Sequence, residues 1–158
     1  MERIEGGVTA AKGFLAAGVA AGIKKGNTKD MALIYSEQPC VAAGTFTTNV
    51  VKAAPVKWDQ HIVYDQPTAQ AVVCNSGVAN ACTGAEGYSY CEQTAQVTAE
   101  ELGIPVESVL VASTGVIGKQ LPMDILKGGV KKLAPLLSPA KEAGTLAAQS
   151  IMTTDTVS

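Results

Sequence analysis

The segment Leu110–Gly118 constrains the fold most, because it has the pattern of a buried strand that ends in a tight turn. Its apolar residues run into a Ser-Thr-Gly step at 113–115, and a helical pattern begins at Pro122. Where a strand turns into a helix, backbone amides lack ladder partners, and a glycine lets a reacting group approach closely. The Thr114 hydroxyl and a neighbouring amide could therefore converge on one oxygen that gains negative charge, as in an oxyanion hole. The alternative is a plain strand end closed by a serine/threonine turn.

The composition indicates an interior packed closely from small side chains. Hydrophobic residues make up 47% of the 158 residues, aromatic residues make up 4%, and 16 positions are glycine. This length suits one medium domain or part of a larger protein. A net charge of −2 argues against a nucleic-acid-binding protein, which needs a clustered basic face. No apolar run is long enough to cross a membrane, and the charged N-terminal residues do not resemble a secretory signal. We therefore expect a cytoplasmic protein that binds neither nucleic acid nor membrane.

The cysteines and the single histidine argue against a metal site or a cysteine nucleophile. Cys40, Cys74, Cys82 and Cys91 are widely and irregularly spaced, and His61 is the only histidine. Zinc sites use closely spaced cysteine or histidine pairs, and a nucleophilic cysteine needs a nearby base. We therefore expect no metal, and we expect the thiols to be small buried side chains in a reducing compartment.

The first half of the chain predicts consecutive antiparallel strands joined by tight turns. Strands are expected at 14–23, 31–35, 40–46 and 71–74. Turn residues at 37–39 separate the second strand from the third. Pro55 limits the segment 50–56 to an edge strand or a loop, and residues 59–68 are interpreted as a polar connection.

Three helices are expected in the second half. The first begins at Thr83, where Glu86 completes a capping box, and it ends at Gly103. The second carries Pro122 in its first turn, and the third begins after residues 138–139. The residues of the third helix expected to face inward are Ala143, Leu146, Ala147 and Ile151.

The order of these elements indicates an α+β fold. Strands come first and strands mixed with helices follow, which predicts mixed sheets packed against helices in a single domain over residues 1–158. The sequence has no Walker loop, dinucleotide-binding fingerprint or calcium-binding loop. It also has no Gly-x-Ser-x-Gly elbow, no serine or cysteine with a credible histidine, and no carboxylate dyad. The residues alone therefore indicate an α+β unit with one polar pocket.

Two polar segments have both a structural and a functional interpretation. Asn75–Gly84 is rich in side chains that bond to the backbone and in residues that tolerate positive φ, so it is either a structural turn or a site wall. Residues 152–158 contain three threonines and an aspartate. They are either a polar tail or a turn that faces substrate, and composition favours the tail.

Four blocks of sequence go beyond these patterns. They are Phe46–Asn49 with Lys52–Val56, Asn75–Gly84, Ser113–Gly118 and Ile151–Thr156. Together, and in this order, they resemble the N-terminal (α) portion of the ornithine/glutamate N-acetyltransferases of arginine biosynthesis. The resemblance covers essentially the whole chain. It implies an α/β-layered fold similar to that of aminopeptidases that use a self-generated N-terminal nucleophile.

The resemblance also implies a mechanism and a set of partners. Members of this family are made as a precursor that cuts itself before a threonine, and the α and β chains stay associated, usually as an α2β2 heterotetramer. The β-chain threonine takes the acetyl group from N2-acetylornithine and passes it to L-glutamate, without a cofactor; acetyl-CoA is a possible co-substrate. The oxyanion-hole pair of the family corresponds to Thr114 and Gly115. A substrate-binding threonine corresponds best to Thr154, with Thr153 as the second candidate.

The chain departs from the family in one large respect. The lysine-containing Gly-Gly-x-x-Lys-Gly segment, the cleavage site, the nucleophile and the β half are absent from residues 1–158. We therefore expect activity only with a partner chain, and we expect the isolated chain to expose apolar surface. Two other functions stay open: a stand-alone module that binds a small anion, and a structural partner subunit without catalysis.

Overall fold

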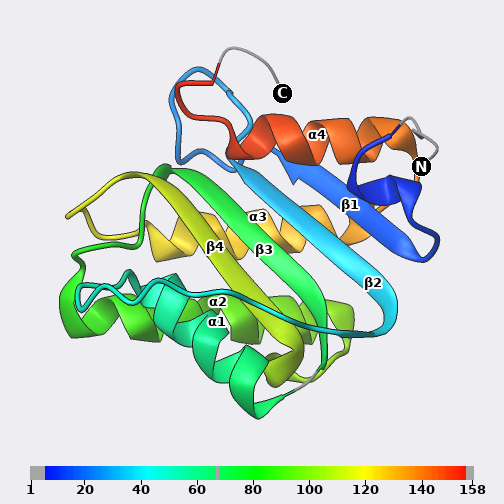
Figure 1. The fold of residues 1–158 in the computed structure, drawn as a ribbon. Helices are drawn as coiled ribbons and strands as arrows, with labels where there is room; N and C mark the ends of the chain where they lie inside the picture. The colour runs from blue at the N-terminus through cyan, green and yellow to red at the C-terminus, as the bar shows by residue number, and fades with distance from the viewer. Residues whose placement is uncertain (1–5, 67, 156–158) are drawn as a thin grey trace.

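A four-stranded mixed sheet forms the centre of the fold (Figure 1). The computed structural model describes residues 6–66 and 68–155. The strands, which lie side by side in chain order, are β1 (Phe14–Val19), β2 (Met31–Val41), β3 (Thr68–Val78) and β4 (Val109–Val116). β2 pairs antiparallel with β1 and with β3, whereas β3 and β4 are parallel. The expected α+β class with a mixed sheet is confirmed.

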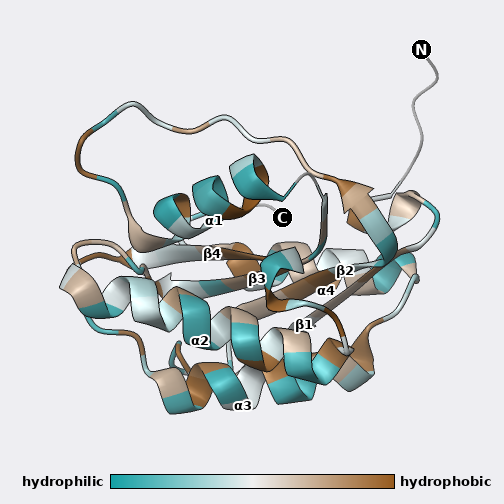
Figure 2. Cartoon of the chain, turned by 90° about the horizontal axis from the view of Figure 1, so that it is seen from below, coloured by the Kyte–Doolittle hydropathy of each residue, from teal (hydrophilic) through white to brown (hydrophobic). Residues whose placement is uncertain are grey.

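Helices lie on both faces of this sheet (Figures 1 and 2). They are α1 (Ala54–Asp65), α2 (Gly84–Leu102), α3 (Met123–Leu133) and α4 (Lys141–Ile151). α2 and α3 cover one face, α1 packs beside α2 at the β4 edge, and α4 lies on the other face, mainly over β1 and β2. Short 3-10 turns occur at Val8–Ala10, Val106–Ser108 and Ala134–Leu136. Within the described residues, the α4 side of β4 is left without a helix, and this opening positions the site.

The alternation of side chains along the strands supplies two separate cores. One set faces α1, α2 and α3 and includes Leu33, Val73 and Val111. The other set faces α4, where Ala16 and Ala32 pack against Ala147. Small side chains keep α4 close to the sheet. At Gly18 an added Cβ would lie 2.3 Å from the carbonyl oxygen of Leu146, so no larger residue fits there without moving the helix.

Helix α1 was not predicted, since residues 50–56 were interpreted as an edge strand or loop and residues 59–68 as a polar connection. Pro55 lies in the first turn of the helix, where its missing N–H costs nothing. Trp58 and Ile62 are buried on one face, while the polar side chains of the same segment lie on the other. Because the helix buries few side chains, its many polar residues gave the segment the pattern of a loop.

The first two strands also differ from the prediction. β1 ends at Val19 rather than at residue 23. β2 runs without a break through the turn expected at 37–39, which is instead an irregularity in the pairing with β3 between Tyr35 and Cys40. A bulge of this kind tolerates the proline at position 39. The expected strand at 40–46 therefore ends at Val41, and residues 42–53 form a loop that passes outside α1 (Figure 2).

The three predicted helices are confirmed in place, with three changes of detail. Pro122 precedes α3 as its N-cap rather than lying in its first turn. α2 ends at Gly103 in the left-handed conformation, as expected. However, the Thr83 hydroxyl donates to the Asn80 side chain and caps no amide, so the expected capping box is not formed. In α4, Leu146 and Ile151 are 37% and 46% exposed rather than inward. No helix in the described ranges is long and apolar enough to cross a membrane.

Candidate functional site

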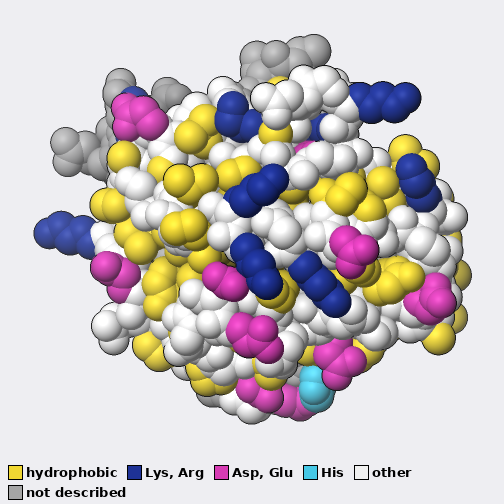
Figure 3. Space-filling view, turned by 180° about the vertical axis from the view of Figure 1, so that it is seen from behind, with side chains coloured by type: hydrophobic (Ala, Val, Ile, Leu, Met, Phe, Trp, Pro, Cys, Tyr) yellow, Lys and Arg dark blue, Asp and Glu magenta, His cyan; other side chains and the backbone are white. Residues whose placement is uncertain are grey.

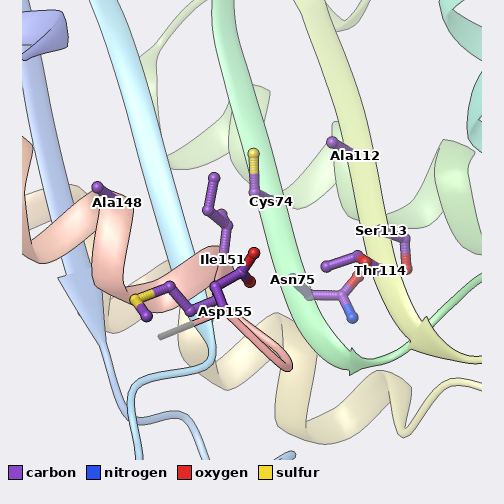
Figure 4. Close-up of a pocket in the computed structure, with 9 residues that line it drawn as sticks. Cys74, Asn75, Ala112, Ser113, Thr114, Ala148, Ile151 and Asp155 are labelled. Atoms are coloured by element: carbon purple, nitrogen blue, oxygen red, sulfur yellow. The ribbon is translucent and has the colours of Figure 1, made fainter. Parts of the chain in front are cut away.

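A cavity of about 500 Å³ opens where β3, β4 and the end of α4 meet (Figure 4). Its lining residues are Cys74, Asn75, Ala112, Ser113, Thr114, Ala148, Ile151, Met152 and Asp155. β3 and β4 supply the floor, α4 supplies one wall, and the segment after α4 closes that wall (Figure 4). Ser113 and Thr114 at the end of β4 thus lie at a cavity, whereas Gly115 does not line it.

Thr114 points to the open side of the sheet. Along β4, Val109 and Val111 are buried on the side of α1 and α2, and the alternation of side chains places Ala112 and Thr114 on the opposite side. Thr114 is exposed, and its hydroxyl forms no hydrogen bond with any residue in 6–66 or 68–155. A hydroxyl donor is therefore free at the cavity wall.

The hydrogen bonds of the β4 backbone indicate the direction of the Gly115 amide. The Trp58 indole N–H donates to the Val109 carbonyl oxygen at 3.0 Å, and the Val111 N–H donates to the Asp59 carboxylate at 2.9 Å. These groups of β4 therefore point away from β3, and the period of two along a strand directs the Gly115 amide to the same edge. The Val116 carbonyl points the other way, as this alternation requires, because it accepts the backbone N–H of Ala79, the residue directly after β3, at 2.9 Å.

The position of Gly115 is fixed by its neighbour across the ladder. Gly115 pairs with Gly77 of β3, and a Cβ at Gly115 would lie 2.4 Å from the Gly77 carbonyl carbon. Gly115 also has φ +128°, a conformation that side chains other than glycine rarely adopt. The ends of the two strands can approach this closely only because residue 115 is glycine.

The polar segment Asn75–Gly84 proves to be mainly a structural turn. The Asn80 side-chain amide donates to the Gly87 carbonyl at 2.7 Å, and the Asn80 backbone N–H donates to the Ser113 hydroxyl at 3.0 Å. The Ser113 hydroxyl in turn donates to the Val78 carbonyl at 3.1 Å. Of this segment, Asn75 alone lines the cavity, and its amide nitrogen is held by the same Val78 carbonyl at 2.8 Å. The segment therefore fixes the end of β4 rather than offering free donors.

Residues 152–155 form a turn at the cavity rather than a free tail. Met152 and Asp155 line the cavity, and the Thr153 amide donates to the Asp155 carboxylate at 2.9 Å. Thr153 and Thr154 are exposed and lie between these two lining residues, although neither lines the cavity itself. Thr156, the last residue of the fourth block, lies outside the described residues, as do residues 157–158. The sequence analysis places this segment among its candidates but assigns the site role to the two threonines, whereas the residues that line the cavity are Met152 and Asp155.

The thiols of Cys74, at the cavity, and of Cys91, in the core on the α2 side, are held in the neutral form. Burial, with a contribution from the charge of Asp59, raises the pKa of Cys74 to about 11 and that of Cys91 to about 12. A protonated thiol is a poor nucleophile, so Cys74 contributes a small apolar surface to the cavity. The expectation that all thiols are buried is wrong for Cys82, which is exposed, and only Cys91 is fully buried, since Cys40 and Cys74 are half-buried. No group of three or more His, Cys, Asp or Glu side chains in the described residues could hold a metal ion.

The ArgJ family profile matches residues 15–158. The chain belongs to the ArgJ family. The family resemblance inferred from the four blocks is thereby confirmed.

Individual ArgJ relatives agree with this assignment. The chain is 50% identical over 157 residues to the arginine biosynthesis bifunctional protein ArgJ of Gloeobacter violaceus, and the match covers 99% of this chain and 38% of that protein. It is 53% identical over 146 residues to the ArgJ of Thermotoga neapolitana, where the match covers 92% of this chain and 36% of that protein. The chain thus spans less than two fifths of the length of these curated relatives.

Two solved ArgJ-related structures share the fold. The ArgJ of Bacillus halodurans aligns with a TM-score of 0.91 at 41% identity, covering 96% of this chain and 78% of the solved chain. The ornithine acetyltransferase of Mycobacterium tuberculosis, solved in complex with ornithine, aligns with a TM-score of 0.92 at 46% identity, covering 96% of this chain and 81% of the solved chain. The mixed sheet with its helices is therefore the fold of ArgJ proteins.

Proposed function

We propose that this chain is the α portion of an acetyltransferase that moves the acetyl group of N2-acetylornithine to L-glutamate. The acetyl group would be carried in between by a threonine of a partner chain. One observation supports this most: Thr114, whose hydroxyl has no partner among the described residues, lines a cavity of about 500 Å³, and Gly115 is the next residue of β4. The names of the relatives, which include an ornithine acetyltransferase, support the same reaction.

The proposed chemistry follows from these two donors. When a nucleophile attacks an acetyl carbonyl, the carbonyl oxygen becomes an oxyanion, and donors already aimed at it lower the barrier. The Thr114 hydroxyl and the Gly115 amide would both donate to that oxygen. Because Gly77 holds Gly115 by close backbone contact, the pair needs little reorganisation during the reaction. The contribution of one such donor is on the order of 10²–10³ in kcat.

The chain supplies donors but no nucleophile, so the proposal requires a second chain. Burial raises the pKa of the cavity thiol, Cys74, and the lining residues include no histidine or lysine. We propose that the nucleophilic threonine begins a β chain cut from the same precursor, and that the chains assemble as α2β2. The present chain covers 78% of the solved Bacillus halodurans chain but only 38% of the Gloeobacter violaceus relative. The solved chain is therefore much shorter than that full-length relative. This difference in length supports the proposal that the precursor is divided into two separate chains.

The substrate side of the proposal concerns the turn after α4. Thr154, with Thr153 as the alternative, would bind the substrate, because both lie between Met152 and Asp155 at the rim of the cavity. The reaction as proposed needs no cofactor. Acetyl-CoA would be a further acetyl donor in a bifunctional enzyme, in line with the names of the relatives. A cytoplasmic location is part of the same proposal.

Mass spectrometry of the natively purified protein tests this function. We expect a companion chain with an N-terminal threonine to purify with this chain. After incubation with N2-acetylornithine, that companion chain should carry one acetyl group, which glutamate then removes. A chain that purifies alone and gains activity with no companion, or a companion that is never acetylated, would contradict the proposal.

A further inference from the structure

The loop between β1 and β2 is organised by a buried carboxylate. Asp30 is fully buried, and its two carboxylate oxygens accept the backbone N–H groups of four consecutive residues, 21–24, at 2.6 to 3.1 Å. Its own backbone is fixed on both sides, because its N–H donates to the Val19 carbonyl at 2.9 Å and its carbonyl accepts from Ser76 at 2.8 Å. Charge-assisted bonds of this kind are strong. The turn at 21–24 is therefore held rigidly by Asp30, which is itself bonded to β1 and to β3.

This turn aims the side chain of Lys24 at the end of α4. The Lys24 ammonium donates to the carbonyl oxygens of Met152 and Lys29, the latter at 3.2 Å. Met152 is the C-terminal cap of α4, and a cation at a helix C-terminus is favoured by the helix dipole and by the unpaired carbonyls. The stem of Lys24 lies over Gly77, where an added Cβ would be 3.0 Å from the Lys24 Cγ.

The end of α4 is tied to the sheet at a second point. The Ser76 hydroxyl of β3 donates to the Ser150 carbonyl, and the Ser150 hydroxyl donates to the Leu146 carbonyl at 2.8 Å. The Ser76 contact fixes the last turn of the helix. The Lys24 contact fixes the residue that follows, from which the turn 152–155 departs.

We propose that Lys24 is a positioning residue for the site. Its ammonium group, held by the Asp30 turn, sets the direction in which the chain leaves α4, and so places the Met152–Asp155 wall relative to Thr114. The inference rests on the proposed function, since the value of this wall lies in binding the substrate of acetyl transfer. Lys24 does not reach the reacting atoms and acts through Met152.

Kinetics of the complex with its companion chain test this role. Lys24→Met keeps the apolar stem over Gly77 and removes the donors. Because a wall that binds substrate equally in the ground and transition states changes KM more than kcat, we expect KM for N2-acetylornithine to rise about tenfold, with kcat changed less than about threefold. Lys24→Arg, which keeps a cation of similar reach, should restore most of the lost affinity. Lys25→Met is the matched control, because the next lysine is exposed, and it should leave both constants unchanged.

Hydrogen exchange provides a readout that does not require catalysis. In Lys24→Met we expect faster amide exchange at residues 153–155, with residues 21–24 as protected as in the wild type, because Asp30 still holds them. Exchange at 153–155 equal to the wild type, or a KM no different from that of Lys25→Met, would overturn the positioning role. If the wild-type complex transfers no acetyl group, the proposed function fails, and the exchange experiment still decides whether Lys24 orders this wall.

Discussion

At the residue scale, the pairing of Gly115 with Gly77 is what places the proposed donors. The sequence predicted a glycine that lets another group approach closely. The structure adds that the approaching group is the backbone of the neighbouring strand, since a Cβ added at Gly115 would lie 2.4 Å from the Gly77 carbonyl carbon. Gly115 is thus required twice, by its positive φ and by this contact. Neither the pairing partner nor the register can be obtained from a single sequence, because both depend on long-range pairing.

Replacing Gly115 with alanine should therefore destabilise the protein. We expect Gly115→Ala to lower the free energy of unfolding by about 1–3 kcal/mol, because of strain at positive φ and overlap with Gly77. Urea denaturation would measure the change. Gly128→Ala in α3 is the matched control, since its Cβ would meet nothing within 4 Å, and it should raise stability by up to about 1 kcal/mol. Equal stability of the two variants would show that the glycine pair is not strained.

At the element scale, helix α1 shows where prediction from the sequence failed and why. Helices α2, α3 and α4 were predicted because their caps and apolar faces are regular in sequence. α1 begins with alanine and proline and buries only Ala54, Pro55, Trp58 and Ile62, so its pattern resembled a polar loop. Its role depends on tertiary contacts: Trp58 and Asp59 occupy the edge of β4 at Val109 and Val111. The free edge of β4 is thereby limited to the end that carries Thr114.

The docking of α1 predicts a pH dependence of stability. Burial raises the pKa of Asp59 to about 6, although the hydrogen bond from the Val111 amide opposes this rise. Because the folded protein then binds this proton more tightly than the unfolded chain does, the Asp59 contribution to stability is present below about pH 4. It is lost as the pH rises to about 6, by at most about 3 kcal/mol. Urea midpoints measured from pH 4 to 8 should show this loss.

The matched variant isolates this carboxyl group. Asp59→Asn keeps an acceptor for the Val111 amide and cannot ionise, so its urea midpoint should vary less with pH and exceed that of the wild type above pH 6. Parallel pH profiles for the two proteins would contradict the assigned pKa.

At the scale of the whole molecule, charged and apolar side chains both reach the surface. On the side where α2 and α3 lie, lysine and acidic side chains are interspersed among apolar ones (Figure 3). At the open end of β4, which is the last strand of the sheet, Val116 and Ile117 are 62% and 63% exposed. Composition predicted the small-residue core, and the order of the expected elements predicted the fold class. Neither could indicate which face is left open, because that depends on where α4 crosses the sheet.

This open end predicts how residues 1–158 behave without a partner. We expect the isolated chain to self-associate or to be poorly soluble, since an exposed apolar strand edge pairs readily with another chain. Light scattering would measure the oligomeric state. Ile117→Lys, which places a charge at the open edge, should shift the distribution towards monomer, whereas Leu136→Lys, at an exposed leucine away from this edge, should not. A monodisperse wild-type monomer would contradict the expectation.

The most direct test of the central claim is the turnover number of Thr114 variants in the complex with the companion chain. If the Thr114 hydroxyl stabilises the oxyanion, Thr114→Ala should lower kcat by about one to three orders of magnitude with KM little changed, and Thr114→Ser should retain most activity. Thr145→Ala, at an exposed threonine of α4, serves as the control. A Thr114→Ala enzyme with the kcat of the Thr145→Ala control would contradict the assignment of Thr114 to the oxyanion hole.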